Sequence, residues 1–445
     1  MSELLSLQRH LAASGGRLYV GTVPGGLALA EPQHSVLVLG PPRSGKTTSL
    51  AVPNTLCAPG PVVVTSTKAD ILAATVGARS RMGRCWLLDP TATVVAPAGV
   101  RRLRWSPVAS AGTWDDALVT ARAMTGAARP AGRQGESWHW TERAEALLAP
   151  LLHAANLQGA GMDSVVGWVL RQDLDRPAAA LQIHGVRLGC DVLAGIAATD
   201  PREQSGIWSS AAGVLAAYRS ERVLDHSAPV NFDPAALITG CDTVYVCAPA
   251  RHQELVAPIV VAFLDAARAG CYSAWADGGP GRAPLTLVLD EMANIAPIPD
   301  LPALVSEGGS QGVLTMGCLQ DLSQARSRWG PAADGFLSLF GSKVVLPGIA
   351  DLATLDLVSR LGGEVDLPAA SVSRAPWWAA GRGAPTVTWS PQRQRRLPLD
   401  AVSQQRPGTA VLLSGGRPPS QVGLTPWWAM PVFRGADREV PGRSL

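Results

Sequence analysis

The stretch HSVLVLGPPRSGKTTS, from His34 to Ser49, decides how the rest of the chain is interpreted. Four apolar residues lead into Gly40, and the residues from Gly40 to Thr47 follow the pattern G-x-x-x-x-G-K-T. This pattern is typical of a loop that follows a buried parallel strand, opens a helix and wraps the phosphates of a nucleotide. The sequence therefore predicts a phosphate-binding loop made of Gly40, Pro41, Pro42, Arg43, Ser44, Gly45, Lys46, Thr47 and Thr48.

The residue types in this phosphate loop suit a nucleoside triphosphate. Gly40 and Gly45 allow positive φ and close backbone approach, so that successive N–H groups point at phosphate oxygens. Lys46 supplies a mobile positive charge for the β- and γ-phosphates, and the hydroxyl of Thr47 is a ligand for Mg²⁺. A chance glycine-rich turn is the alternative, but the motif is complete and follows a strand. We therefore expect ATP and Mg²⁺ as cofactors.

The length, composition and net charge of the chain limit the classes of protein to which it can belong. The chain has 445 residues, 47% of them hydrophobic and 16% charged, which is typical of a globular protein with about two or three domains. The formal net charge is +3, so no overall basic field attracts nucleic acid, and any contact with DNA must be local.

Cysteine spacing and hydropathy exclude two further classes. The seven cysteines are scattered without the spacing of a zinc site, so we expect reduced core residues. The N-terminus lacks the apolar run of a signal peptide, and no apolar run reaches the length of a membrane-spanning helix. The expected location is therefore cytoplasmic.

Strand and helix patterns alternate along the chain, which predicts an α/β fold with a mainly parallel central sheet flanked by helices. One long interval instead shows helical spacing alone, as in 141–157, and is predicted to be an inserted all-α domain. Buried strands are predicted at 61–65, 85–89, 242–247, 284–290, 312–320 and 342–347, with a closing hairpin at 409–413 and 421–424.

These patterns divide the chain into five parts. Residues 1–33 form an N-terminal extension, with a short helix and a glycine-rich turn or hairpin. Residues 227–430 include a stretch rich in proline, tryptophan and arginine, about 368–396, that is interpreted as a mobile loop. The two halves of the nucleotide-binding domain are predicted at 34–112 and 227–430. The all-α insertion lies between them at 113–226, and 431–445 is predicted to be a disordered tail.

Two acids follow the apolar run 284–289. In phosphate-loop ATPases an acid at such a strand end holds Mg²⁺, and its neighbour orients or deprotonates the attacking water. Strands often end in acids, but the complete phosphate loop upstream strengthens the case for Asp290 and Glu291. Gln320 ends the next strand and is interpreted either as a sensor of the γ-phosphate and the water or as a polar cap. The predicted catalytic residues are Lys46, Glu291 and Gln320.

Five segments occur in a characteristic order: GPPRSGKTTS, STKAD, LTLVLDEMANIAPIPDLPALVSEGGSQGV, CLQDLSQAR and GSKVVLPGIAD. Over about 18–430 this order resembles the TraG/TraD-type coupling proteins of type IV secretion, DNA-pumping ATPases related to the FtsK and HerA translocases. The resemblance implies a RecA-like P-loop NTPase with an all-α domain, which assembles as a homo-hexameric ring with ATP at the subunit interfaces. By position, it assigns phosphate and Mg²⁺ binding to Lys46 and Thr47, the metal and catalytic acids to Asp290 and Glu291, and the sensor to Gln320.

The implied function is an ATP-dependent translocase that brings DNA, alone or linked to protein, to a secretion or conjugation channel. A relaxase or other secretion components are the implied partners. Coupling proteins usually begin with transmembrane helices and this sequence shows none, so contact with the inner face of the membrane is expected only through a partner.

A second departure concerns the arginine that many family members carry in the stretch 306–312 and offer to the neighbouring subunit's γ-phosphate. Gly309 stands at that place in this chain. The candidates to replace it are Arg326, Arg328 and Arg360.

DNA contact is predicted near the end of the chain. Cations interleaved with aromatic side chains are typical of single-strand binders. The residues concerned are Arg393, Arg395 and Arg396, with Trp377, Trp378 and Trp389. A solvated surface loop anchored by tryptophan is the alternative, and the strandedness of the DNA stays open.

Two other functions remain open at this stage. One is a non-hydrolysing ATP-binding adaptor that recruits cargo to a secretion system. The other is a HerA- or FtsK-like translocase in DNA processing, which would require a nuclease partner.

Overall fold

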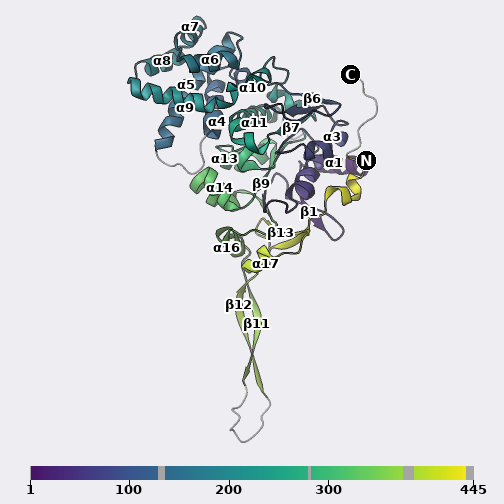
Figure 1. The fold of residues 1–445 in the computed structure, drawn as a ribbon. Coiled ribbons are helices and arrows are strands. Elements are labelled where there is room, and N and C mark those ends of the chain that lie inside the picture. The colour runs from purple at the N-terminus through teal and green to yellow at the C-terminus, as the bar shows by residue number, and fades with distance from the viewer. Residues whose placement is uncertain (1, 129–135, 279–281, 374–384, 437–445) are drawn as a thin grey trace.

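The computed structural model describes residues 2–128, 136–278, 282–373 and 385–436 (Figure 1). Its centre is a 12-stranded sheet in the order β2-β1-β14-β13-β10-β3-β9-β8-β4-β7-β5-β6. Its strands are β1 (Tyr19–Val23), β2 (Gly26–Leu29), β3 (Val36–Leu39), β4 (Val62–Ser66), β5 (Cys85–Leu88), β6 (Val100–Arg102), β7 (Thr243–Cys247), β8 (Leu285–Leu289), β9 (Val313–Leu319), β10 (Ser342–Val345), β13 (Thr409–Ser414) and β14 (Ser420–Gly423).

The predicted parallel sheet is confirmed. From β10 to β6 every neighbouring pair is parallel, and β13 joins β10 antiparallel. Short runs such as VVVTS and LTLVL are buried along their whole length, as strands covered on both faces require. The order β3-β9-β8 places the strands that carry the phosphate loop, Gln320 and the two acids next to one another.

The helix and hairpin predicted within 1–33 are present, but the hairpin joins the main sheet instead of forming an extension outside it. After α1 (Ser2–Ala13), β1 pairs with both β2 and β14 at the edge of the main sheet. Buried Asn54 ties β1 to the helix after the phosphate loop: Asn54 Oδ1 accepts from the Tyr19 N–H at 2.8 Å, and Asn54 Nδ2 donates to the Tyr19 carbonyl at 2.9 Å. The segment therefore belongs to the nucleotide-binding domain.

The stretch predicted as an all-α insertion contains seven α-helices within its described residues, and in Figure 1 they gather at one end of the molecule. Apolar residues on one stripe of α5, including Leu147, Leu148 and Leu151, are fully buried. The helices are α4 (Trp114–Ala127), α5 (Glu136–Leu157), α6 (Met162–Arg171), α7 (Asp175–Ile183), α8 (Arg187–Ala197), α9 (Pro201–Val214) and α10 (Glu221–Asp225).

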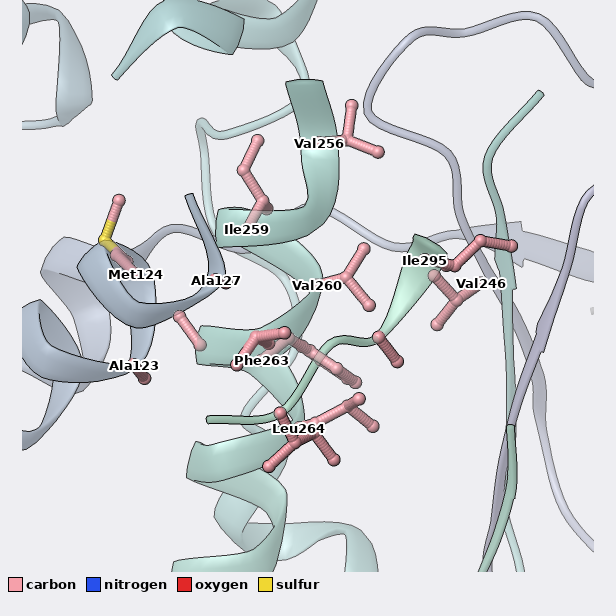
Figure 2. Packing of buried hydrophobic residues seen from close by; sticks show 14 of the residues in the cluster. Ala123, Met124, Ala127, Val246, Val256, Ile259, Val260, Phe263, Leu264 and Ile295 are labelled. Carbon is pink, nitrogen blue, oxygen red and sulfur yellow. The ribbon is translucent and has the colours of Figure 1, made fainter. Parts of the chain in front are cut away.

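Helix α11 (Gln253–Ala276) joins this helical part to the sheet. Figure 2 shows Val260 and Phe263 of α11 between Met124 of α4 on one side and Val246 of β7 on the other. By length and composition alone, this helix would pass as a membrane span within the described residues. Because its apolar residues are buried against α4 and the sheet, we interpret α11 as a core helix.

The remaining helices flank the sheet and connect its strands. They are α2 (Val52–Cys57), α3 (Asp70–Arg79), α12 (Met292–Ile295), α13 (Leu301–Glu307), α14 (Leu322–Trp329), α15 (Phe336–Leu339), α16 (Leu352–Leu361) and α17 (Leu399–Ser403).

The stretch interpreted as a mobile loop contains two strands, which corrects the sequence interpretation of 368–396. β11 (Glu364–Ser373) pairs antiparallel with β12 (Thr386–Arg395), and both extend away from the body in Figure 1. A proline within each run argued against strands, since proline removes a backbone donor. Trp377 and Trp378 lie outside the described residues.

The C-terminal part also departs from expectation. The hairpin of β13 and β14 is confirmed, but Phe433 and Ala436 are buried, so the described residues 431–436 are packed on the body and not disordered. Residues 437–445 lie outside the described part. The short edge strand β6 was not predicted, because its three residues, VRR, carry no apolar run.

The turns at the amino edge of the sheet are held by a buried arginine. The guanidinium of Arg79 donates to the carbonyls of Ala58 and Gly60 at 2.7 Å, to that of Cys241 at 3.1 Å and to Thr243 Oγ1 at 2.7 Å. One side chain thus satisfies acceptors from two loops that precede neighbouring strands.

Replacing this arginine should strongly destabilise the fold. Arg79→Leu leaves several buried acceptors without a donor, and each such loss costs about 1–3 kcal/mol. We expect the free energy of unfolding, measured in urea, to fall by about 3 kcal/mol or more. The control Arg202→Leu, at an exposed position of α9, should change it by less than about 0.5 kcal/mol. A similar small loss for Arg79→Leu would contradict the assigned role.

Candidate nucleotide-binding site

The phosphate loop leaves β3 in a conformation that its glycines allow. The Gly40 N–H donates to the Leu319 carbonyl of β9 at 3.1 Å, and a Cβ on Gly40 would stand 2.8 Å from Ser44 Oγ and 2.9 Å from Leu346 Cβ. Arg43 and Gly45 have φ of 64° and 98°. Left-handed residues within such a loop form the concave backbone that binds phosphate through N–H groups. The loop therefore fits a triphosphate.

The helix that follows the loop opens with a π-helical turn, Thr47–Ala51, before α2. Turns of this kind occur frequently at functional sites. Lys46 immediately precedes it with helical φ and ψ, and its buried ammonium donates to the carbonyl of Gly40 and, at 2.9 Å, to that of Pro41. The positive charge is thus held against the inner side of the loop.

Asp290 connects the loop to the end of β8. Thr47 Oγ1 donates to Asp290 Oδ2 at 2.9 Å, while Thr65 Oγ1, on β4, donates to the Asp290 carbonyl at 2.9 Å. Asp290 is only 7% exposed. Burial raises the pKa of its carboxyl to about 6, and the hydrogen bond from Thr47 opposes that rise. The structure therefore brings together the two predicted ligands of Mg²⁺.

Glu291 follows in a strained conformation. Its φ of 59° and ψ of 46° lie in the left-handed region, which is uncommon for a residue with a side chain. Asn294 Nδ2 donates to Glu291 Oε2 at 3.2 Å and orients the carboxylate. Strain of this kind often persists where function requires a fixed side chain.

Gln320 directly follows β9, which ends at Leu319 and lies between β3 and β8. This topology places Gln320 between the phosphate loop and the acids, on the edge where the carboxyl ends of parallel strands meet. Its backbone N–H donates to Gln324 Oε1 at 3.0 Å. The position suits the predicted sensor, and the role of its side chain stays a prediction.

The structure explains why glycine stands at position 309. A Cβ on Gly309 would lie 2.0 Å from the carbonyl oxygen of Gln33, a residue that itself has φ of 65°. No larger side chain fits there while Gln33 keeps this position. An arginine is therefore excluded by packing against the segment before β3.

The three candidate arginines lie in different surroundings. Arg326 contacts Asp334 at 3.1 Å and Asp351 at 3.9 Å, and Arg328 donates to the carbonyl of Ala127. Arg360, with a side chain 69% exposed, pairs with Asp356 at 2.8 Å.

The arginines predicted to contact DNA lie at the base of the β11–β12 hairpin. Arg393 pairs with Glu364 at 2.6 Å and Arg395 with Asp356 at 2.8 Å. Arg396 Nε donates to the Glu364 carbonyl at 3.2 Å. These side chains thus have acidic or carbonyl partners within their own chain.

Two residues of the site were not predicted from sequence, Thr65 and Asn294. Thr65 ends an otherwise apolar run, which marks a polar strand end beside β8. Asn294 stands three residues after Glu291, a spacing that brings side chains together on a helix. The signal at Thr65 became specific only once β4 and β8 were known to be neighbours.

Comparison with known proteins identifies the family. A family model described as type IV secretory system conjugative DNA transfer matches residues 8–438. The chain therefore belongs to this family, as the order of its sequence segments had suggested. A search of curated proteins finds no match.

Solved structures share the fold. The unbound bacterial conjugative coupling protein TrwBdeltaN70 has a TM-score of 0.70 and 20% sequence identity, over 94% of this chain and 91% of that chain. TrwB with ADP and Mg²⁺ has a TM-score of 0.67 and 20% identity, over the same 94% and 91%. TrwB with the non-hydrolysable ATP analogue ADPNP has a TM-score of 0.68 and 19% identity, again over 94% and 91%. The predicted P-loop NTPase fold with an inserted helical part is therefore confirmed.

The raised pKa of Asp290 makes a prediction about stability. The pKa of the Asp290 carboxyl is about 6 in the folded protein, against the usual 3.8. The neutral carboxyl therefore contributes its full share to the free energy of unfolding below pH 3.8, and this contribution is lost as pH rises through 6. At pH 7.5, Asp290→Asn removes the buried charge and should raise the free energy of unfolding by up to about 3 kcal/mol.

Urea denaturation of the nucleotide-free protein at pH 7.5 and pH 5 measures this effect, and the gain should shrink at the lower pH. Asp191→Asn, at an exposed position of α8, is the matched control. Lower stability of Asp290→Asn at pH 7.5 would show that burial is not what sets this pKa.

Proposed function

We propose that this member of the conjugative DNA transfer family is an ATPase, which binds ATP and Mg²⁺ at the phosphate loop and couples hydrolysis to DNA transfer toward a secretion channel. The observation that carries the proposal is the 2.9 Å hydrogen bond between Thr47 and Asp290. It unites the end of the phosphate loop with the acidic end of β8, the two halves from which a hydrolytic site is built.

The donor set fits Mg²⁺ bound to a nucleotide. This ion prefers oxygen ligands and usually keeps several waters, with one or two carboxylates and the phosphates of the substrate completing its coordination. The carboxylate of Asp290 and the hydroxyl of Thr47 would hold it, and it would neutralise charge on the phosphates. The comparison with TrwB, solved with ADP and Mg²⁺, supports this assignment.

Each remaining residue has a role that its position allows. Lys46 neutralises the β- and γ-phosphates from within the loop. Glu291, oriented by Asn294, accepts a proton from the attacking water, and Gln320 holds that water against the γ-phosphate.

The assembly and partners are part of the same proposal. The chain forms a homo-hexameric ring with the nucleotide between copies, and one arginine from a neighbour, among Arg326, Arg328 and Arg360, completes the site. DNA is the cargo, a relaxase or other secretion component delivers it, and contact with the membrane is made through a partner.

A non-hydrolysing adaptor is the second candidate. Gly309 favours it, because the packing against Gln33 leaves no room for the arginine that family members offer in trans. The family match, by contrast, favours conjugative transfer over a role in DNA processing.

Two variants separate hydrolysis from binding. Lys46→Ala should lose both ATP binding and turnover. Glu291→Gln should keep ATP binding but lower kcat by about 10²–10⁴-fold, because the proton acceptor is gone. Phosphate release and fluorescent-nucleotide binding, measured with and without DNA, report the two effects. Glu254→Gln, at an exposed position of α11, should behave as the wild type.

Full turnover by Glu291→Gln would contradict the catalytic role of this residue. ATP binding by the wild type without turnover, with or without DNA, would instead support the adaptor.

Complementation identifies the arginine. Replacing the arginine that acts in trans with alanine should lower kcat by about 10³-fold or more. Mixing that variant with Lys46→Ala should restore part of the activity, because an intact loop from one copy then meets an intact arginine from the other. Arg202→Ala serves as the control. Unchanged turnover in all three single variants would remove Arg326, Arg328 and Arg360 from the proposal.

A further inference from the structure

The β11–β12 hairpin, called the arm below, stands away from the body of the molecule (Figure 1). Its two strands pair from Glu364 with Arg395 to Ser373 with Thr386. An isolated two-stranded hairpin is at best marginally stable in water and needs a further strand or a packing surface. Within the described part of the chain, no further strand joins the sheet of the arm.

The two faces of the arm differ in chemistry. Because side chains alternate along a strand, one face is apolar over its outer part. The other carries mostly serine, threonine and glutamine, with Val365, Leu367 and Ala369 as exceptions. Val372 is 55%, Val387 48% and Trp389 65% exposed. We call the first the apolar face; its members are Pro368, Ala370, Val372, Val387, Trp389 and Pro391.

The edges of the arm are less suited to binding than this face. Pro368 stands directly opposite Pro391, so neither strand offers an amide proton at that level to an added strand. Proline at exposed edges is a common protection against edge-to-edge pairing. The apolar face is thus the surface available to a partner.

The charges of the arm indicate what kind of partner fits. Within its described strands the acidic and basic residues lie near the base, where Arg393 pairs with Glu364 and Arg395 pairs with Asp356 of α16. The described residues farther out, 367–373 and 386–392, carry no charge. Nucleic acid binding depends on cations that neutralise phosphates. An uncharged apolar face fits a protein surface instead.

The arm is attached beside the nucleotide site. In α17, which follows the arm, the Ser403 carbonyl accepts from the Gly348 N–H at 2.8 Å. A Cβ on Gly348 would in turn lie 3.2 Å from Pro41 of the phosphate loop. In the proposed ring the nucleotide lies between two copies of the chain, so this region lies next to the neighbouring copy.

The area of the apolar face indicates whether the arm could form a complete interface by itself. The apolar face covers five residues of each strand, roughly 17 Å, and two strands with their side chains are roughly 10 Å wide, which gives about 170 Å². A stable interface buries about 800 Å² per partner. The arm is too small to be a complete interface, so it extends a larger one.

We propose that the apolar face of the arm binds the neighbouring copy of this chain in the ring and strengthens the contact beside the nucleotide site. The proposal rests on the proposed function for the ring itself. Val372, Val387 and Trp389 supply the contact, with the tryptophan as its main anchor, since aromatic residues dominate binding at interfaces.

Matched triple variants test the proposal. Val372→Thr, Val387→Thr and Trp389→Gln together remove the apolar side chains. Leu367→Thr, Ser371→Thr and Ser390→Gln introduce the same residues on the opposite face of the same strands. Sedimentation velocity with a non-hydrolysable ATP analogue and DNA should show that the first variant needs at least about tenfold more protein to assemble. The second should assemble as the wild type, and both should bind nucleotide normally. Equal assembly of both variants would overturn the proposal.

Photo-crosslinking identifies the contact directly. With p-benzoylphenylalanine in place of Trp389, ultraviolet light should join two copies of the chain, and the same replacement at Ser390 should not. A crosslink only to DNA or to anionic lipid vesicles, or none in assembled protein, would overturn the proposal.

The two proposals fail in distinguishable ways. A wild type that hydrolyses ATP but stays monomeric overturns the role of the arm and keeps the enzyme. Arm-dependent assembly without turnover keeps the arm and overturns the ATPase.

Discussion

The hydrogen bond between Thr47 and Asp290 is the interaction on which the site depends. It joins residues 243 positions apart, and it forms only because β9 alone separates β3 from β8. The helical part that separates the two halves of the sequence leaves this neighbourhood intact, because it leaves the sheet after β6 and returns at β7. Sheet order therefore matters more to the chemistry than distance along the chain.

The site combines charge burial with backbone strain. Asp290 is buried enough for its pKa to rise, and Glu291 beside it holds a left-handed conformation. Both features cost stability, and both place an acid at the mouth of a loop that presents positive charge and N–H groups. Features of this kind at adjacent residues are typical of functional sites.

Local sequence patterns predicted the parallel strands, the phosphate loop and the acids, because each is a contiguous run with its own chemistry. What they missed depended on contacts between distant segments. Thr65 acquires a role only once β4 and β8 are paired, and the N-terminal residues enter the sheet only through β14. The arm was not predicted for a different reason. Pro368 and Pro391 interrupt the alternation of side chains that indicates a strand. Proline that prevents pairing at an exposed edge also weakens the sequence signal for a strand.

The close approach of Gln33 to Gly309 has a consequence for any attempt to place an arginine at position 309. The carbonyl of Gln33 occupies the space in which a side chain at position 309 would begin. Arginine introduced at position 309 alone would therefore clash with Gln33 and could not act as a finger. An engineered finger at this position would first require a remodelled turn before β3, so a residue 276 positions away restricts what position 309 can carry.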